Sequence, residues 1–347
     1  MARKKKGRPV NGILVLDKPA GMTSNSALQK VKKLFQAQKA GHTGSLDPLA
    51  TGVLPICLGE ATKVSHFLLD ADKCYRAKCI LGSVTTTGDS DGEVIANHPV
   101  PQLSEQQLLN LLASFQGEQE QTPPMYSALK YNGRPLYEYA RKGIEIERKA
   151  RHINIFTIKL LNYSFNTDDS FNTDGSGKAF IDIEVHCSKG TYIRSLCEDI
   201  GQAIGCGAHI SALRRLESGP FLLSQSVSLP ALTEKFAPYD ELDDIDKKRM
   251  DNLLLPADTA INELPAVTLN AEEYERIQHG HAIVHKPEIH LYAVHPQESH
   301  SQNSRQASAA DSASGSEHYR LYYNNTLIAL AILDESGYLK PKRLLFL

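Results

Sequence analysis

The order of apolar and polar residues predicts both strands and helices in the first two thirds of the chain. Residues 13–16 form a continuous apolar run, and residues 75–81 and 179–187 alternate between apolar and polar side chains, as strands do. Two other segments repeat apolar residues at helical spacing. One begins at Ser24, a suitable N-cap, and has a basic side, and the other follows residues 188–191. The pattern therefore predicts half-buried antiparallel strands combined with amphipathic helices.

The last third of the chain has a different pattern, which predicts a separate unit. An acidic stretch, residues 240–251, is followed by Pro256, and we interpret it as a linker. Beyond it come a short capped helix, residues 270–278, and two strands, residues 319–323 and 326–333. Asn324 and Asn325 between these strands predict a tight hairpin turn. A small β-barrel of about 80 to 90 residues fits this spacing of short strands and turns.

Three segments lack any regular pattern. Residues 1–11 are basic and contain a proline, which predicts a flexible tail able to touch an anionic partner. Residues 164–178 contain Ser-Phe-Asn-Thr-Asp twice, and residues 297–317 are rich in Ser, Ala and Gln. Such polar, low-complexity composition cannot bury enough apolar surface to fold. We expect both to be disordered insertions.

Composition narrows the possible functions only a little. The 347 residues carry 38 Lys and Arg against 40 Asp and Glu, a net charge of -2, so a nucleic acid would have to be held by a local basic patch. The six cysteines form no CxxC pair, which favours reduced core thiols in a cytoplasmic protein over a structural zinc site. No apolar run is long enough for a signal peptide or a membrane span.

The segment from Gly41 to Gly52 combines three glycines with Thr, Ser, His and Asp side chains. It is not a P-loop, because Val53 and not Lys follows its last glycine. Asp47 has no second carboxylate nearby in the sequence and precedes a proline, which holds its backbone extended. A stiffly held, isolated loop carboxylate is a candidate nucleophile, but the spacing alone favours the interpretation that Asp47 caps a helix that begins at Pro48.

A local basic run could supply the nucleic-acid contacts. Between Lys130 and Arg151 there are seven basic and three acidic residues, a balance of +4, with tyrosines interleaved. This composition suits RNA binding, although a charge run can also be a solvated face. The candidate contacts in this run are Lys130, Arg141, Lys142 and Lys149.

Five motifs, in this order along the chain, resemble the TruB family of tRNA pseudouridine-55 synthases. They are residues 41–55 with Gly59-Glu-Ala-Thr-Lys63, Tyr75-Arg76-Ala77, Ser188-Lys-Gly-Thr-Tyr-Ile-Arg194, Cys206-Gly-Ala-His209 and Leu213-Arg-Arg-Leu216. The resemblance covers roughly residues 10–220. It implies an α+β fold: a mixed, mainly antiparallel pseudouridine-synthase sheet with flanking helices, a thumb-like insertion and a small C-terminal PUA-like β-barrel.

The resemblance also implies the domain boundaries and an activity. The catalytic domain would span residues 12–255, with the thumb at about 124–152, and the RNA-binding PUA-like domain residues 257–347. The activity would be isomerisation of uridine to pseudouridine at position 55, in the T-loop of tRNA. Because this reaction has no net redox change and loses no group, we expect neither a cofactor nor a metal.

The resemblance assigns roles to individual residues. Asp47 would be the nucleophile, attacking either C1′ of the ribose or C6 of the base, with Arg194 paired to it. Tyr75 would lie over the flipped base and help proton transfer from C5, while Tyr192 and Leu213 line the pocket. Two further residues would contact RNA: His42 and Lys63.

Each of these residues also has a purely structural interpretation. Arg194 could instead pair with Glu198, one helical turn along. Tyr75, Tyr192 and Leu213 could be ordinary core residues, and His42 a structural histidine.

The expected partner is the T-arm stem-loop of tRNA, bound by a monomer with no obligate protein partner. Two other functions stay open. One is a non-catalytic RNA-binding or tRNA-folding protein, and the other is a guide-dependent relative within a ribonucleoprotein. Residues 49–55 resemble the stand-alone branch, and an assay on naked tRNA would separate these possibilities.

Overall fold

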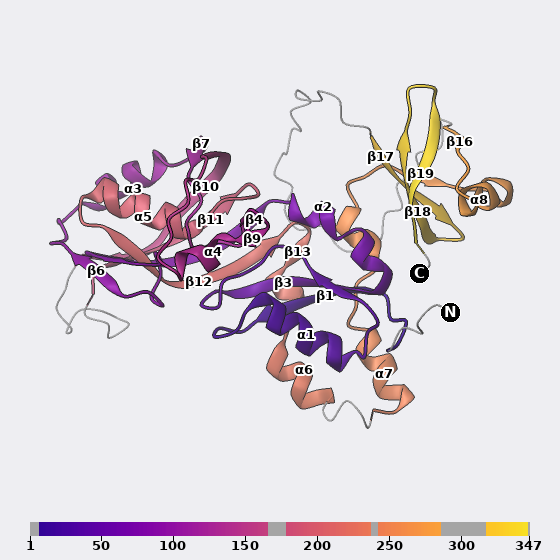
Figure 1. The fold of residues 1–347 in the computed structure, drawn as a ribbon, viewed down its shortest axis with the longest axis horizontal. Helices are drawn as coiled ribbons and strands as arrows, with labels where there is room; N and C mark the ends of the chain where they lie inside the picture. The colour runs from indigo at the N-terminus through magenta and orange to yellow at the C-terminus, as the bar shows by residue number, and fades with distance from the viewer. Residues whose placement is uncertain (1–6, 166–177, 237–241, 286–316, 346–347) are drawn as a thin grey trace.

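A mixed sheet of ten strands forms the centre of the protein, which confirms the expected α+β fold class (Figure 1). The computed structural model describes residues 7–165, 178–236, 242–285 and 317–345. The strand order is β14-β1-β3-β12-β4-β11-β10-β7, with β2 beside β3 and β13 beside β12. Within this sheet, the β1–β14 and β3–β12 pairs are parallel and the other strand pairs are antiparallel. The strands are β1 (Gly12–Lys18), β2 (Ala40–His42), β3 (Thr51–Leu58), β4 (Lys73–Leu81), β7 (Gly117–Gln121), β10 (Arg151–Ser164), β11 (Phe180–Cys187), β12 (Ala208–Ser218), β13 (Phe221–Leu222) and β14 (Val227–Ser228).

Two pairs of helices cover one face of this sheet. Helices α1 (Ser24–Leu34) and α6 (Leu229–Phe236) lie over β1 and β3, and α3 (Glu105–Ala113) and α5 (Ile193–Ile204) lie over β4, β10 and β12. The apolar stripes expected from the sequence point into this core, which explains why the helices form there. The predicted strands and helices are therefore confirmed, with shifts of one or two residues at their ends.

The start of α1 differs from the expectation. Thr23, not Ser24, is the N-cap, and its side chain accepts a hydrogen bond from the N–H of Ser26 at 3.1 Å. The Ser24 hydroxyl is buried and binds the backbone of Leu46 instead, accepting from its N–H at 2.7 Å and donating to its carbonyl at 3.0 Å. The sequence contains two possible capping hydroxyls in succession, and a contact 22 residues away decides between them.

The opposite face of β1 and β3 is covered by segments from the end of the chain. A second apolar cluster joins both strands to α2 (Ser65–Leu69) and to the 3-10 helix η4 (Ala257–Ile261). Leu327, Leu330 and Leu345 of the C-terminal unit belong to the same cluster. Apolar residues on both sides of the expected domain boundary, residues 255–257, therefore pack in one continuous cluster.

The acidic stretch before this point is not an extended linker. Residues from Asp244 form helix α7 (Asp244–Asp251), whose N-cap Asp243 accepts from the N–H of Asp246 at 2.7 Å. Acidic residues lie in its first turn and Lys248 and Arg249 in its last, so its charges complement the helix dipole. After α7, Leu255 exchanges two backbone hydrogen bonds of 2.8 Å with Ile13.

The C-terminal unit contains a five-stranded sheet and helix α8 (Ala271–Gln278). Its strand order is β15-β17-β18-β19-β16. Asn324 and Asn325, at φ of 47° and 59°, form the predicted turn between β17 and β18. The strands are β15 (Ala266–Thr268), β16 (Ile283–Val284), β17 (His318–Tyr323), β18 (Thr326–Leu333) and β19 (Tyr338–Leu344).

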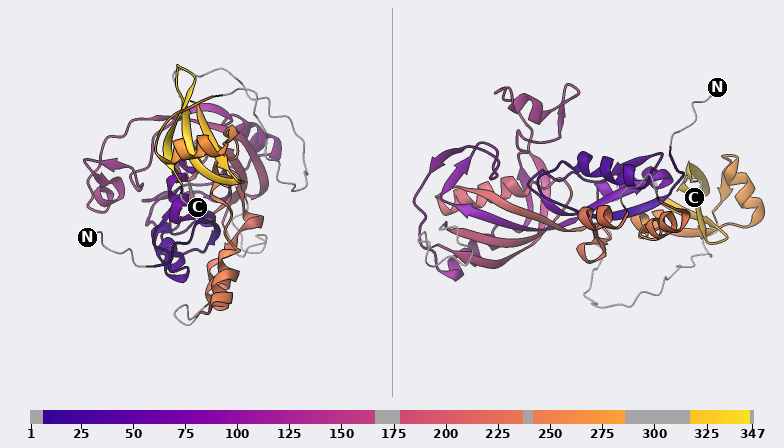
Figure 2. Two further views of the ribbon diagram at one scale, coloured as in Figure 1. Left: turned by 90° about the vertical axis from the view of Figure 1, so that its right-hand side faces the viewer. Right: turned by 90° about the horizontal axis from the view of Figure 1, so that it is seen from below.

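The thumb-like segment stands out from the body of the protein (Figure 2). It contains a two-stranded hairpin and a short helix: β8 (Lys130–Tyr131), β9 (Arg134–Pro135) and α4 (Leu136–Ala140). The remaining elements are β5 (Ser83–Thr85), β6 (Val94–Asn97), and the 3-10 helices η1 (Gly59–Lys63) and η2 (Leu223–Gln225).

The three segments expected to be disordered begin or end in ordered structure. The tail is fixed from residue 7 onward, because the N–H of Arg8 donates to the Gln36 carbonyl and its guanidinium pairs with Asp251 at 2.5 Å. Ser164 ends β10 and Phe165 is buried, so the first insertion begins after them. Residues 166–177, and the second insertion apart from Glu317, lie outside the described residues.

Two findings concern the cysteines and the length of the helices. All six cysteines are buried and unpaired. No helix in the described part of the chain is long and apolar enough to cross a membrane.

We predict that shortening the chain to Pro256 destabilises it more than shortening it to Leu264. The shorter version lacks η4, and burial of Ile261 alone contributes about 1.5–3 kcal/mol. Urea unfolding of the two truncated proteins, followed by circular dichroism, measures the difference. Equal midpoints would mean that η4 belongs to the C-terminal unit alone.

Candidate active site

The loop from Thr43 to Ala50 joins β2 to β3 and is held by hydrogen bonds to residues far away in the sequence. No helix begins at Pro48. The chain bends there and enters β3 at Thr51, so the helix-cap interpretation of Asp47 is wrong. The Pro48 carbonyl accepts from the N–H of Gly21 at 2.9 Å and from the ammonium of Lys18 at 3.4 Å. The turn between β1 and α1 therefore fixes the backbone beside Asp47.

Gly52 lets this loop approach β12 closely. Its φ is +100°, and a Cβ atom there would lie 2.1 Å from the carbonyl oxygen of Arg215. The Arg215 side chain approaches the other end of the loop, where one of its N–H groups donates to the Gly44 carbonyl at 3.0 Å. The conformation of the loop thus depends on residues roughly 170 positions later in the chain.

Asp47 forms an ion pair with Arg194, the second residue of α5. The Asp47 carboxylate lies 3.0 Å from Arg194 Nε, and the Arg194 side chain is only 5% exposed while that of Asp47 is 42% exposed. Arg194 also lies 3.6 Å from Asp89 and donates to the carbonyl oxygens of Thr87, at 2.9 Å, and Tyr126, at 2.5 Å. Its pairing is therefore with the two aspartates, and the sequence alternative of a helical ion pair with Glu198 is not formed.

The protonation of Asp47 reflects competing influences. Burial raises the pKa of the Asp47 carboxyl, and the nearby Asp89 raises it further. The positive charges of Arg194 and Lys18 oppose this rise. Lys18 is itself fully buried, and burial lowers its pKa to about 8. The carboxylate is thus open to the pocket on one side and surrounded by charged protein groups on the other.

Asp47 opens into a pocket of about 710 Å³ that brings together most of the residues singled out in the sequence. Tyr75, Tyr192, Arg194 and Leu213 all line it. The backbone of Tyr192 is held by the Gln121 side chain, which accepts from its N–H at 2.7 Å and donates to its carbonyl at 3.1 Å. Four more cations line the pocket: Lys73, Arg151, Lys189 and Arg215.

Tyr75 of β4 lies opposite Arg215 of β12 in the sheet. Burial raises the pKa of the Tyr75 hydroxyl, while the positive charge of Arg215 opposes the rise. Because the net shift is upward from an ordinary tyrosine, Tyr75 keeps its proton near neutral pH. Burial also raises the pKa of the Tyr192 hydroxyl.

Two of the expected RNA contacts lie outside this pocket. His42 is on β2, opposite Ile56 of β3, and burial lowers its pKa, with Arg215 adding to the effect. Lys63 donates to the Leu344 carbonyl at 2.7 Å and lies 2.5 Å from Glu60, so it joins η1 to the C-terminal unit. Neither side chain lines the pocket around Asp47.

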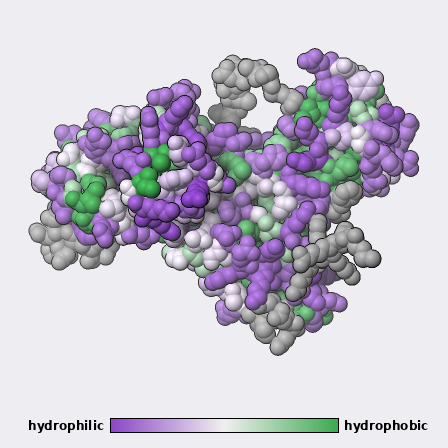
Figure 3. Space-filling view, viewed as in Figure 1, coloured by the Kyte–Doolittle hydropathy of each residue, from purple (hydrophilic) through white to green (hydrophobic). Residues whose placement is uncertain are grey.

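The thumb connects to the pocket at its base and exposes its basic residues further out. Ser127, Ala128 and Leu129 line the pocket, and the preceding Tyr126 carbonyl accepts from Arg194. Hydrophilic side chains gather over α4 and β9 on the face shown in Figure 3. The four candidate RNA contacts, Lys130, Arg141, Lys142 and Lys149, are all exposed.

The sequence analysis assigned no role to four charged residues that surround Asp47 or line its pocket. They are Lys18, Lys73, Asp89 and Arg215. Arg215 belongs to the motif Leu213-Arg-Arg-Leu216, and Lys18 follows the apolar run of residues 13–16, which are the signals that could have marked them. Asp89 had no such signal, because its loop packs against Ile210 of β12 only through tertiary contacts.

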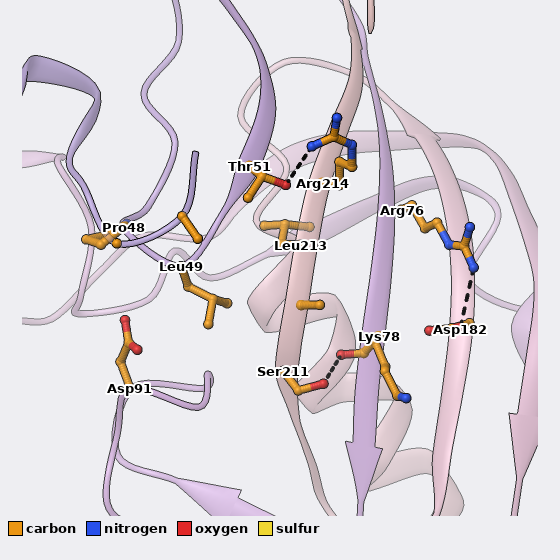
Figure 4. Close-up of a pocket in the computed structure, with 13 residues that line it drawn as sticks. Pro48, Leu49, Thr51, Arg76, Lys78, Asp91, Asp182, Ser211, Leu213 and Arg214 are labelled. Atoms are coloured by element: carbon orange, nitrogen blue, oxygen red, sulfur yellow. Dashed lines mark hydrogen bonds and ion pairs between the residues drawn. The ribbon is translucent and has the colours of Figure 1, made fainter. Parts of the chain in front are cut away.

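A second hollow, of about 680 Å³, is lined by Arg76, Lys78 and Arg214 (Figure 4). Pro48 and Leu49 form one wall, so the same loop separates the two hollows. Its arginines are paired: Arg76 lies 3.6 Å from Asp182, and Arg214 lies 2.8 Å from Asp17. No group of three or more His, Cys, Asp or Glu side chains that could hold a metal occurs among residues 7–165, 178–236, 242–285 and 317–345.

We predict that Gly52→Ala destabilises the protein far more than Gly205→Ala. Both glycines have positive φ, which costs about 1–2 kcal/mol for alanine, but nothing lies within 4 Å of a Cβ atom at Gly205. At Gly52 the added atom would overlap the backbone of Arg215, so we expect a further loss of about 2 kcal/mol or more. Thermal unfolding measures both variants, and similar losses would show that the loop relaxes around the new side chain.

Comparison with known proteins identifies the family of this chain. Residues 32–193 match the model of the TruB family pseudouridylate synthase N-terminal domain, and residues 194–262 match the tRNA pseudouridylate synthase B C-terminal domain. A protein of Vibrio atlanticus named tRNA pseudouridine synthase B is 51% identical over 280 residues, which are 81% of this chain and 84% of that protein. One of the same name from Chromohalobacter salexigens is 45% identical and covers 99% of this chain and 97% of its own.

Solved structures show the same fold at lower identity. A Cbf5-Nop10-Gar1 complex contains a chain with a TM-score of 0.65 and 23% identity, covering 99% of this chain and 91% of that one. An archaeal Nop10-Cbf5 complex matches with a TM-score of 0.63 and 22% identity, over 100% and 93% of the two chains. The two family models, which together match well over half of the sequence, and the relatives of 45–51% identity show that the chain belongs to the TruB family of pseudouridylate synthases.

Proposed function

We propose that the protein converts uridine to pseudouridine at position 55, in the T-loop of tRNA, with Asp47 as nucleophile. The observation that carries this proposal is the Asp47–Arg194 ion pair at the base of a pocket that Tyr75 also lines. The relatives that are 45–51% identical are named for action on tRNA, which supports this choice of RNA.

The chemistry uses only groups that the pocket contains. The N1–C1′ bond breaks, the base turns, C5 bonds to C1′, and the hydrogen lost from C5 is balanced by one gained at N1. Asp47 attacks either C1′ or C6, and Arg194 keeps the carboxylate ionised and aimed. No step changes the oxidation state of the substrate, so the reaction needs no cofactor.

Because Asp47 lines a pocket, the target uridine must swing out of the stacked bases to reach it. Asp47 lies in a pocket, and a base stacked inside an RNA loop cannot reach it without being flipped out. Flipping costs a few kcal/mol, which stacking on an aromatic ring offsets in part. Tyr75 is the aromatic residue that fits this role, with Tyr192 and Leu213 on the pocket wall.

The rest of the RNA would be held by surfaces outside the pocket. The thumb supplies exposed positive charge, and the C-terminal sheet forms the second, PUA-like RNA-binding domain of the proposal. His42 lies on the strand that leads into the catalytic loop, a position from which it can wedge against neighbouring bases. The protein would act as a monomer without a guide RNA or an obligate protein partner.

We predict that Asp47→Asn abolishes the chemical step while leaving RNA binding within roughly tenfold, about 1.4 kcal/mol, of the native protein. Asparagine keeps the size of the side chain but lacks the nucleophilic oxygen and the negative charge. The assay uses naked tRNA transcripts tritiated at uridine C5, because bonding of C5 releases that hydrogen to water.

The native protein should release one label per target site, with no nucleotide added and with excess chelator present. Asp182→Asn, which changes a carboxylate on the opposite sheet face, is the matched control and should behave as native. Release by Asp47→Asn near the native rate would remove Asp47 from the chemistry. No release by the native protein on naked tRNA would contradict the proposed function itself.

We further predict that replacing Arg141, Lys142 and Lys149 with Gln weakens binding in a salt-dependent way. The slope of log affinity against log salt should become shallower by about 0.7–0.9 for every RNA phosphate that the thumb no longer neutralises. The matched control replaces three other exposed cations, Lys159, Lys235 and Arg249, which lie away from the thumb. An unchanged slope for the thumb variant would show that the thumb faces solvent in the complex.

A further inference from the structure

The proposed reaction depends on the walls of the pocket around Asp47. When the N1–C1′ bond breaks, the uracil is no longer held through the ribose, and it must turn before C5 can bond to C1′. During that turn the residues that line the pocket keep the base close to Asp47. A misplacement of about 1 Å can slow such a step by about 100-fold. Residues that fix the pocket walls are therefore expected to set the rate.

Tyr192 is a wall residue that lies at the start of a helix. It is the N-cap of α5, and its side chain makes no capping hydrogen bond there. The first N–H groups of a helix have no partner within the helix, so they need one from elsewhere. The position of the Tyr192 ring therefore depends on what binds its backbone.

Gln121 binds both backbone groups of Tyr192. Its side-chain oxygen accepts from the Tyr192 N–H at 2.7 Å, and its side-chain nitrogen donates to the Tyr192 carbonyl at 3.1 Å. This pairing needs an acceptor and a donor side by side, which an amide side chain provides. The two bonds hold the peptide groups on both sides of the Tyr192 Cα, and so fix the direction in which its side chain leaves the backbone.

The location of Gln121 suits a positioning role and not a contact with substrate. It is the last residue of β7, it is 5% exposed, and it pairs with Arg151 in the ladder between β7 and β10. Gln121 does not line the pocket itself, although Arg151 does. The thumb leaves the sheet just after Gln121. This residue therefore joins the sheet at the base of the thumb to the pocket wall.

Arg194, two residues after Tyr192, has its own support. Two aspartates and two backbone carbonyls hold its guanidinium. Loss of the Gln121 amide should therefore loosen Tyr192 and leave the ion pair between Arg194 and Asp47 in place.

We propose that Gln121 is a positioning residue that holds the Tyr192 ring on the pocket wall while the uracil turns. The inference deepens the proposed function and rests on it. Gln121 acts through Tyr192, and Tyr192 is the group that contacts the substrate. Because the exposed cations of the thumb would supply RNA affinity, loss of Gln121 should slow the chemical step without weakening binding.

The test uses two changes at Gln121 and one matched control. Gln121→Met keeps the length of the side chain but removes both bonds, and Gln121→Glu keeps the acceptor and loses the donor at neutral pH. The control is Gln119→Met on the same strand, which removes a 2.7 Å hydrogen bond to the Phe115 carbonyl away from the pocket. Circular dichroism, thermal unfolding and RNA affinity are measured for each variant.

The first readout is single-turnover tritium release at saturating RNA. We expect Gln121→Met to slow release by about 30- to 100-fold with RNA affinity within about threefold of native, as for a misplaced pocket wall. Gln121→Glu should slow it by about tenfold and Gln119→Met by less than about threefold, because one bond or both bonds to Tyr192 remain. In a Tyr192→Ala background, Gln121→Met should cost less than about threefold, because the ring that it positions is already absent.

The second readout needs no RNA and follows the Tyr192 ring directly. Tyr192 is replaced by fluorotyrosine, whose fluorine NMR signal reports the surroundings of the ring. Gln121→Met should shift or broaden this signal, and Gln119→Met should leave it as in the native protein. If Gln121→Met does not fold, Gln121→Glu takes its place in both readouts.

Three results would overturn the proposal. One is an unchanged fluorine signal in the folded Gln121 variant, and another is an equal loss of rate in the native and Tyr192→Ala backgrounds. The third is a loss of RNA affinity as large as the loss of rate. Failure of the native protein on ordinary tRNA would instead contradict the proposed function.

Discussion

The site depends on one buried guanidinium that ties four segments together. Arg194 joins α5 to the loop of Asp47, to the loop of Thr87 and Asp89, and to the Tyr126 carbonyl at the base of the thumb. Its burial makes each of these bonds stronger than it would be in water, and makes the loss of any partner expensive. Asp47, which we propose as the nucleophile, its electrostatic surroundings and the base of the thumb are therefore held in one network.

The loop that carries Asp47 shows how an irregular segment is kept rigid. Lys18 and Ser24 hold it from the β1–α1 side, and Arg215 holds it from β12. Gly52 takes positive φ where the backbone lies against Arg215 of β12. The loop itself has little regular hydrogen bonding, so its precision comes from the elements packed around it.

The sequence predicted the regular parts of this fold well, because their signals are local. Apolar periodicity gave the strands at β4 and β11 and the apolar stripe of α5, and the paired asparagines gave the β17–β18 turn. The tertiary contacts were harder to predict. Whether Ser24 caps a helix or binds Leu46 depends on a residue 22 positions away, and nothing local marks Asp89 as a partner of Arg194. The sequence analysis missed helix α7 because a highly charged segment is typical of a linker. The acidic residues of this segment nevertheless come before its basic ones, an order that complements the dipole of a helix.

The strand order also determines when a working site can exist during synthesis. Asp47 is made early, but Arg194 and Arg215, which hold it and its loop, follow roughly 150 and 170 residues later. Strand β3 gains its neighbour β12, and β1 its neighbour β14, only after most of the central sheet has been translated. At about 5–20 residues per second, the loop waits on the order of 10–30 s for its partners. The nascent chain therefore lacks the assembled site until the sheet closes.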